Sequence, residues 1–133
     1  MSIKPLPYLF LSVVLVTACN WDTYGPEKIV PNFWLMSIDS WEHPHIFYAE
    51  DPLNRTNNNM LVPFTVKNIY LSKSHMVVTQ IPDLLFENDS NEVYHLIELA
   101  NHKNHLKFSS KNELDSALEL NNMLNILKNE YKR

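Results

Sequence analysis

The sequence predicts an α+β domain, with a small, mostly antiparallel sheet of about five strands covered by a C-terminal helix. Three observations support this class. Short apolar runs with period-two alternation recur between residues 32 and 108. Clusters rich in Asn, Asp, Pro and Ser separate these runs, as expected for turns in a chain with only one glycine. After residue 110 the apolar residues change to helical spacing.

The strands follow from the apolar runs taken in order. Residues 92–99 are apolar on both alternating faces, which predicts a central strand buried on both sides. Ser72-Lys73-Ser74 has the composition of a hairpin turn, and residues 50–59 and 82–91 read as loops. The predicted strands are 32–38, 45–49, two within 60–81, and 92–99, with a brief further pairing at 106–108.

The C-terminal helix has a recognisable start. Ser110 and Glu113 have the spacing of a capping box, in which each side chain binds a backbone N–H of the first turn. A seam for a partner helix is one use of the apolar stripe that follows, but barely two heptads are present, so we favour a lid over the sheet. The stripe steps by three and four through Ala117, Leu120, Leu124, Leu127 and Tyr131.

The N-terminus predicts export. Lys4 precedes an uncharged apolar stretch, residues 6–18, which is shorter than the roughly 20 residues of a membrane span and suits a signal peptide. Small Thr17 and Ala18 then precede Cys19, the only cysteine. We therefore expect a signal peptide at 1–18, a tether at 19–31 and a single domain at 32–133.

The run Leu15-Val16-Thr17-Ala18-Cys19 resembles the lipobox of bacterial lipoproteins. The resemblance implies diacylglycerol on the Cys19 thiol, cleavage between Ala18 and Cys19, and, in many bacteria, acylation of the new amine. It also implies a lipid-anchored protein outside the cytoplasm, held to the bilayer through Cys19. Because Asn20 is not the aspartate of an inner-membrane retention signal, the outer membrane is expected in a Gram-negative cell. An uncleaved N-terminal anchor and an ordinary secretory signal are the alternatives.

The order of the predicted elements is also similar to an uncharacterised family of small bacterial lipoproteins. In that family a cysteine is followed by an aromatic-rich strand, a hairpin, a further strand and a closing helix. The matching stretches are Asn32 to Ser37, Val62 to Gln80, Tyr94 to Leu99 and Phe108 to Leu118. The family carries no known activity, so the resemblance implies an order of elements and no chemistry.

Histidines are the first candidates for chemistry. His43 and His45 form one close pair, and His102 and His105 flank a predicted turn, whereas His75 and His95 stand alone. Zinc requires three or four ligands, and neither pair supplies a third from nearby sequence. We therefore predict no metal site and expect histidines that lie at the surface or are satisfied by local partners.

A group of acidic residues lies in or beside the second long loop. Such a group could bind calcium weakly, but the glycine and the regular spacing of an EF-hand are absent. We expect a solvated loop. The group consists of Asp83, Glu87, Asp89 and Glu92.

The remaining patterns restrict the class of function. No Gly-x-Ser-x-Gly or phosphate-binding glycine loop is present, and the cysteine is assigned to lipid, so we predict neither an enzyme nor a cofactor. With 11 basic and 15 acidic residues and no basic patch, nucleic acid is not an expected partner. We expect a membrane-anchored module that binds a protein of the cell envelope, such as an immunity-type or inhibitor lipoprotein. A structural or accessory component of an envelope assembly is the alternative.

Overall fold

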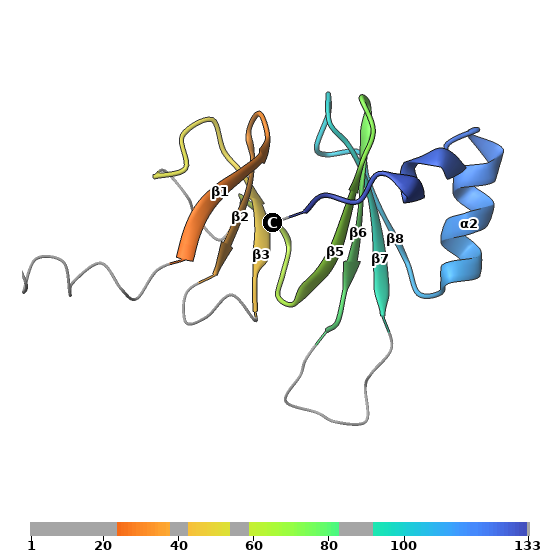
Figure 1. Ribbon diagram of the computed structural model, residues 1–133, viewed down its shortest axis with the longest axis horizontal. Coiled ribbons are helices and arrows are strands. Elements are labelled where there is room, and N and C mark those ends of the chain that lie inside the picture. Colours follow the sequence, from red (N-terminus) through yellow and green to blue (C-terminus); the bar gives the residue numbers. More distant parts are fainter. Residues whose placement is uncertain (1–23, 38–42, 54–58, 83–91, 133) are drawn as a thin grey trace, which may run out of the picture.

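The computed structural model describes residues 24–37, 43–53, 59–82 and 92–132. They form two four-stranded antiparallel sheets, each with its strands in sequence order, and two C-terminal helical segments (Figure 1). The first sheet contains β1 (Tyr24–Val30), β2 (Phe33–Ser37), β3 (His45–Tyr48) and β4 (Met60–Val62). The second contains β5 (Val66–Leu71), β6 (His75–Gln80), β7 (Val93–Glu98) and β8 (His105–Phe108), followed by α2 (Lys111–Leu120) and the 3-10 helix η2 (Leu124–Lys128).

The α+β class, with mostly antiparallel sheet and a C-terminal helix, is confirmed. The single sheet of about five strands is wrong, because the described residues form two sheets of four strands. The predicted strands at 32–38, 45–49, 92–99 and 106–108 all form, as β2, β3, β7 and β8. The error arises at two places, the start of the domain and the passage from β4 to β5.

The first error concerns the predicted tether at 19–31. Its second half is β1, which pairs with β2 across a two-residue turn, Pro31-Asn32. Asn32 has a φ of 72°. Proline followed by asparagine at positive φ is the signature of a type II turn, and this was the sequence signal for the missing strand. Residues 19–23 lie outside the described part of the chain.

The second error concerns the alternating run that starts at Met60. Val62 and Val66 are buried, but Phe64 between them is 58% exposed, so the alternation does not continue through one strand. The Thr65 N–H donates to the carbonyl of Ile81, which follows β6 of the second sheet (3.1 Å). The Val66 N–H donates to the carbonyl of Pro44, which precedes β3 of the first sheet (2.9 Å). The chain therefore passes from the first sheet to the second at residues 63–65. The predicted hairpin with its turn at 72–74 is confirmed as β5 and β6.

The two sheets face each other across a shared apolar core, and α2 forms a third layer on the far side of the second sheet (Figure 1). As predicted, β7 is buried on both faces: Ile97 lies between the sheets, whereas Tyr94 and Leu96 contact the helices. The core between the sheets contains Ile29, Phe33, Leu35, Ile46, Val62, Val66, Ile69, Met76, Val78 and Ile97. The core under the helices contains Val77, Tyr94, Leu96, Leu114, Leu118 and Ile126.

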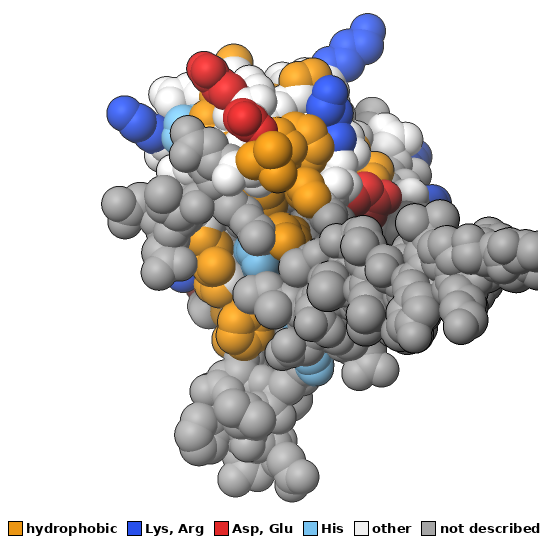
Figure 2. Space-filling view, turned by 90° about the vertical axis from the view of Figure 1, so that its left-hand side faces the viewer, with side chains coloured by type: hydrophobic (Ala, Val, Ile, Leu, Met, Phe, Trp, Pro, Cys, Tyr) orange, Lys and Arg blue, Asp and Glu red, His pale blue; other side chains and the backbone are white. Residues whose placement is uncertain are grey.

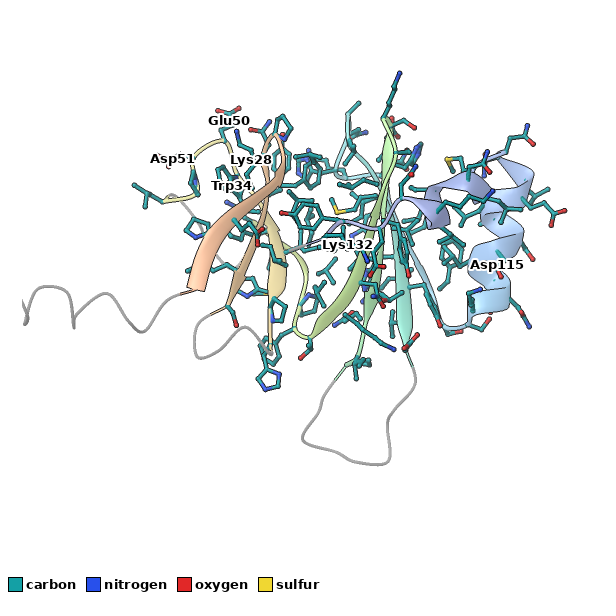
Figure 3. All side chains as sticks on the ribbon, viewed as in Figure 1. Lys28, Trp34, Glu50, Asp51, Asp115 and Lys132 are labelled. Carbon is teal, nitrogen blue, oxygen red and sulfur yellow. The ribbon has the colours of Figure 1, made fainter. Side chains whose placement is uncertain are left out.

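A smaller cluster lies on the other face of the first sheet. Phe47 packs there with Met36 and Ala49, and the Trp34 indole N–H donates to the Ala49 carbonyl (2.9 Å). The ammonium of Lys28 on β1 lies 5.7 Å from the centre of the Trp34 ring (Figure 3). On this side of the molecule apolar side chains reach the surface between acidic and basic ones (Figure 2).

Helix α2 begins at the predicted N-cap, Ser110, but the glutamate binds the residue before the N-cap. The Ser110 hydroxyl accepts the Glu113 N–H (3.2 Å), and the Glu113 carboxylate accepts the backbone N–H of Ser109 (3.2 Å). The predicted stripe is wrong, however: α2 ends at Leu120, which is 86% exposed, and the buried pair is Leu114 and Leu118.

The end of α2 is set by a Schellman motif. Asn122 takes the left-handed conformation with a φ of 55°, and its N–H donates to the Glu119 carbonyl (3.1 Å). The Met123 N–H donates to Leu118 (2.7 Å), and both of these side chains belong to the core under the helices. These two bonds and this contact define the motif, which turns the chain away from the helix axis.

Asn122→Gly is expected to stabilise the fold by about 0.5–1 kcal/mol, because glycine adopts a left-handed conformation without the Cβ penalty. Urea unfolding measures the change. Asn125→Gly, inside η2, is the matched control and is expected to destabilise. A loss of stability in Asn122→Gly would contradict this account of the helix end.

After η2 the chain joins the two sheets. The Leu71 N–H donates to the Asn129 carbonyl (3.0 Å) and the Tyr131 N–H to Ile69 (2.7 Å), so residues 129–131 pair along the free edge of β5. The Tyr131 hydroxyl then donates to the Glu27 carboxylate on β1 (2.8 Å). In Figure 1 this C-terminal segment runs from η2 past β5 toward the first sheet. Tyr131, predicted on a helix stripe, instead connects the sheets.

Candidate binding groove and buried histidine pair

The predicted lipidation site, Cys19 with Ala18 before it, lies outside the described residues and stays a prediction. Three members of the acidic group, Asp83, Glu87 and Asp89, also lie outside them. The fourth member, Glu92, pairs with the Lys67 ammonium and accepts the Tyr94 hydroxyl (2.9 Å). The hydrogen bonds from Lys67 and Tyr94 lower the pKa of this carboxyl.

The histidine pairs that are close in sequence make separate contacts. The ring of His43 lies 3.2 Å from the Thr65 hydroxyl, and the ring of His45 lies 6.1 Å from that of Phe47. His102 stacks on Tyr48 with 3.8 Å between ring centroids, which holds the β7–β8 turn against β3. In the described part of the chain, no group of three or more His, Cys, Asp or Glu is placed to hold a metal ion.

The structure instead brings His95 and His105 together. His95 on β7 is fully buried, and its Nδ1 lies 2.7 Å from Nε2 of His105 on β8. Its other nitrogen, Nε2, lies 2.7 Å from the amide oxygen of Gln80 on β6. Because this oxygen accepts, Nε2 of His95 donates, and Nδ1 then accepts the N–H of His105. Both nitrogens of the neutral His95 ring are satisfied.

The electrostatics keep this pair neutral. Burial lowers the pKa of His95 to about 3, with further contributions from His105 and Lys107. Burial also lowers the pKa of His105, again with a contribution from Lys107. The sequence signal was the place of His95 in an apolar alternation, between Val93 and Ile97, on a strand predicted to be buried on both faces.

A groove lies at one end of the second sheet, on the side of the helices. It consists of two adjoining hollows of about 440 and 290 Å³, which share Ser74 and Met123. We call it the Asn-rich groove. Its lining is Ser72, Lys73, Ser74, His75, Leu96, Glu98, Asn104, Leu106, Asn121, Asn122, Met123, Asn125, Ile126 and Asn129.

Turns build the Asn-rich groove, which explains why Asn and Ser are frequent in its lining. The β5–β6 turn supplies Ser74, and the β7–β8 turn supplies Asn104, whose amide donates to the Glu98 carboxylate (2.6 Å). The Schellman turn supplies Asn121, whose amide donates to the Ala117 carbonyl (2.8 Å). Leu106, on the edge strand β8, is 52% exposed in the same hollow. Sequence reasoning missed the groove, because its walls come from turns far apart in the chain.

A serine, a histidine and a glutamate meet in this groove. The Ser74 hydroxyl lies 2.8 Å from Nδ1 of His75, and His75 is the cross-strand partner of Glu98. A Ser-His-acid relay needs one ring nitrogen on the serine and the other on the acid. Among the described side chains, no hydrogen bond joins His75 to Glu98. The described side chains therefore do not form such a relay.

No family model matches this chain, and neither a curated protein nor a solved structure does. No helix among the described residues has both the length and the apolar character needed to span a bilayer.

Proposed function

We propose that this protein is a lipid-anchored module of the cell envelope that binds another protein through the Asn-rich groove. The groove carries the proposal because its lining suits a peptide chain. Asparagine side chains offer the same donor and acceptor groups as a peptide bond. Exposed Leu106 adds apolar contact area among them.

The neighbouring strand supports the same mode of binding. β8 is an edge strand, with β7 as its only strand neighbour in the described part of the second sheet. Edge strands accept an extended segment of a partner through backbone hydrogen bonds, while pockets beside them take its side chains. Leu106 lies on β8 and lines the groove, so one extended segment would contact both.

The anchor in this proposal is Cys19, acylated after cleavage at Ala18-Cys19. Only residues 20–23 separate Cys19 from the start of β1, so the domain would lie close to the membrane. One short acyl chain binds a bilayer only marginally, whereas two or three hold a protein durably. The proposed location is outside the cytoplasm, at the outer membrane in a Gram-negative cell.

For the anchor, we expect Cys19→Ser to release the protein from membranes or leave it unprocessed, because serine has no thiol to acylate. Intact mass of membrane-extracted wild-type protein is expected to show an N-terminus at Cys19 with added acyl mass. The neighbouring change Asn20→Gln is the control and is expected to keep that mass. An unmodified wild-type chain beginning at Met1 would refute the anchor.

Binding through the groove is tested by photo-crosslinking in the cells that produce the protein. A photoreactive residue in place of Leu106 is expected to capture a defined envelope protein. Leu53, 86% exposed on the loop after β3 in the first sheet, is the matched control position. The same adducts from both positions, or none from Leu106, would refute the proposal. Adducts with subunits of one large membrane complex would indicate the accessory role instead.

A further inference from the structure

We infer that the Asn-rich groove binds a lysine or arginine side chain of the partner protein, with its cationic head at Glu98. This inference rests on the proposed function and specifies the chemistry that the groove recognises.

The charge comes from Glu98, the only acidic residue among the described residues that line the groove. One carboxylate oxygen, Oε2, accepts the Asn104 amide, which orients the group. The other, Oε1, has no hydrogen bond or ion pair with the part of the chain that the structure describes. Lys73 lines only the neighbouring hollow and forms no ion pair with Glu98. Glu98 therefore retains an acceptor and its charge for a ligand.

The groups around Glu98 match the rest of a basic side chain. Leu106 and half-buried Met123 offer apolar surface to an aliphatic stem. The Asn121 amide nitrogen is engaged with Ala117, which leaves its oxygen as a second acceptor. An ammonium or guanidinium has only donors, three or five of them, and so suits a site rich in acceptors.

The net charge of −4 favours the same class of partner. A basic protein is attracted to an acidic one over distances comparable with the Debye length, about 10 Å at 0.1 M salt. Binding of the partner should therefore weaken as salt is added.

The test uses N-acetyl-lysine amide and N-acetyl-arginine amide as probes, with N-acetyl-norleucine amide as the uncharged analogue. We expect both cationic probes to shift the backbone amide signals of Glu98, Leu106 and Met123 in a saturable manner by NMR, and norleucine amide to bind more weakly. Glu98→Gln keeps the shape of the side chain and is expected to weaken the cationic probes about fivefold or more. Glu50→Gln, exposed in the loop that follows β3, makes the same charge change and should bind like the wild type.

The outcomes separate this inference from the proposed function. Equal binding of norleucine amide, unchanged affinity in Glu98→Gln, or no shift at the groove signals would overturn the cationic recognition. If crosslinking from Leu106 persists undiminished in Glu98→Gln, the groove remains a binding surface and only the inference fails. If the photoreactive residue at position 106 captures no partner and the wild-type protein shows no probe shifts, the proposed function fails as well.

Discussion

Acidification from pH 7 to pH 5 is expected to lower the free energy of unfolding by about 2 kcal/mol through His95 alone. The pKa of this histidine is 6.5 in its ordinary environment and about 3 in the fold. At pH values between these two pKa values, His95 is protonated in the unfolded chain and neutral in the folded protein. The stability is therefore fully present above about pH 6.5 and is lost as the pH falls toward 3. His105, whose pKa is also lowered, acts with the same sign.

Urea unfolding at a series of pH values measures this effect. His95→Gln removes the titrating ring, so its stability should depend less on pH between 7 and 5. The pKa of the Glu92 carboxyl is lowered from its ordinary value of 4.5, so its effect on stability falls mainly below pH 5. Val78→Ala is the control. It should lower the free energy of unfolding by about 2 kcal/mol, because Val78 is the buried cross-strand partner of His95. Because His95 is unchanged, the pH dependence of stability should be that of the wild type. Identical slopes in the wild type and His95→Gln would contradict the burial argument.

Deletion of residues 129–133 is expected to destabilise the protein by about 2–4 kcal/mol, since it removes backbone pairing and the partly buried Tyr131 ring. It also uncovers the edge of β5, and open edges promote aggregation. Chemical unfolding and light scattering measure the two effects.

Two single substitutions divide the effect of this deletion. Tyr131→Phe keeps the ring against the core and removes the hydroxyl that binds the Glu27 carboxylate and approaches the Lys28 carbonyl, so it should cost about 1 kcal/mol. Lys132→Ala changes only an exposed ion pair with Glu130 in the same segment and should have little effect. A deletion protein as stable as the wild type would show that the C-terminal segment does not hold the sheets together.

Local patterns predicted most of the elements and failed where long-range pairing decides. The alternation at β7 correctly predicted a strand buried on both faces, because the direction of successive side chains is a local property. The capping box correctly placed the start of α2. By contrast, Ala117, Leu120 and Leu124 fitted a continuous stripe, but Asn122 in a left-handed conformation ends the helix. The spacing of apolar residues predicts which of them share a face only as far as the helix or strand extends.

The residues of the candidate site show the same difference between local and long-range information. The lone place of His95 in the sequence did not indicate a partner, because His105 reaches it across the β7–β8 pairing. Glu98, Asn104 and Asn121 meet only because two hairpin turns and the end of α2 lie at one end of the second sheet. Spacing along the chain does not encode such a meeting.

The sequence by itself determined the α+β class, most of the strands and the start of the helix, because periodicity and capping act over a few neighbouring residues. It is also the sole basis for the proposed anchor at Cys19. Only the tertiary structure decided that the strands divide into two sheets, that the C-terminal segment joins them, and that a neutral histidine pair and an Asn-rich groove exist. Each of these depends on contacts between residues that are distant in the chain, and local preferences do not select among such contacts.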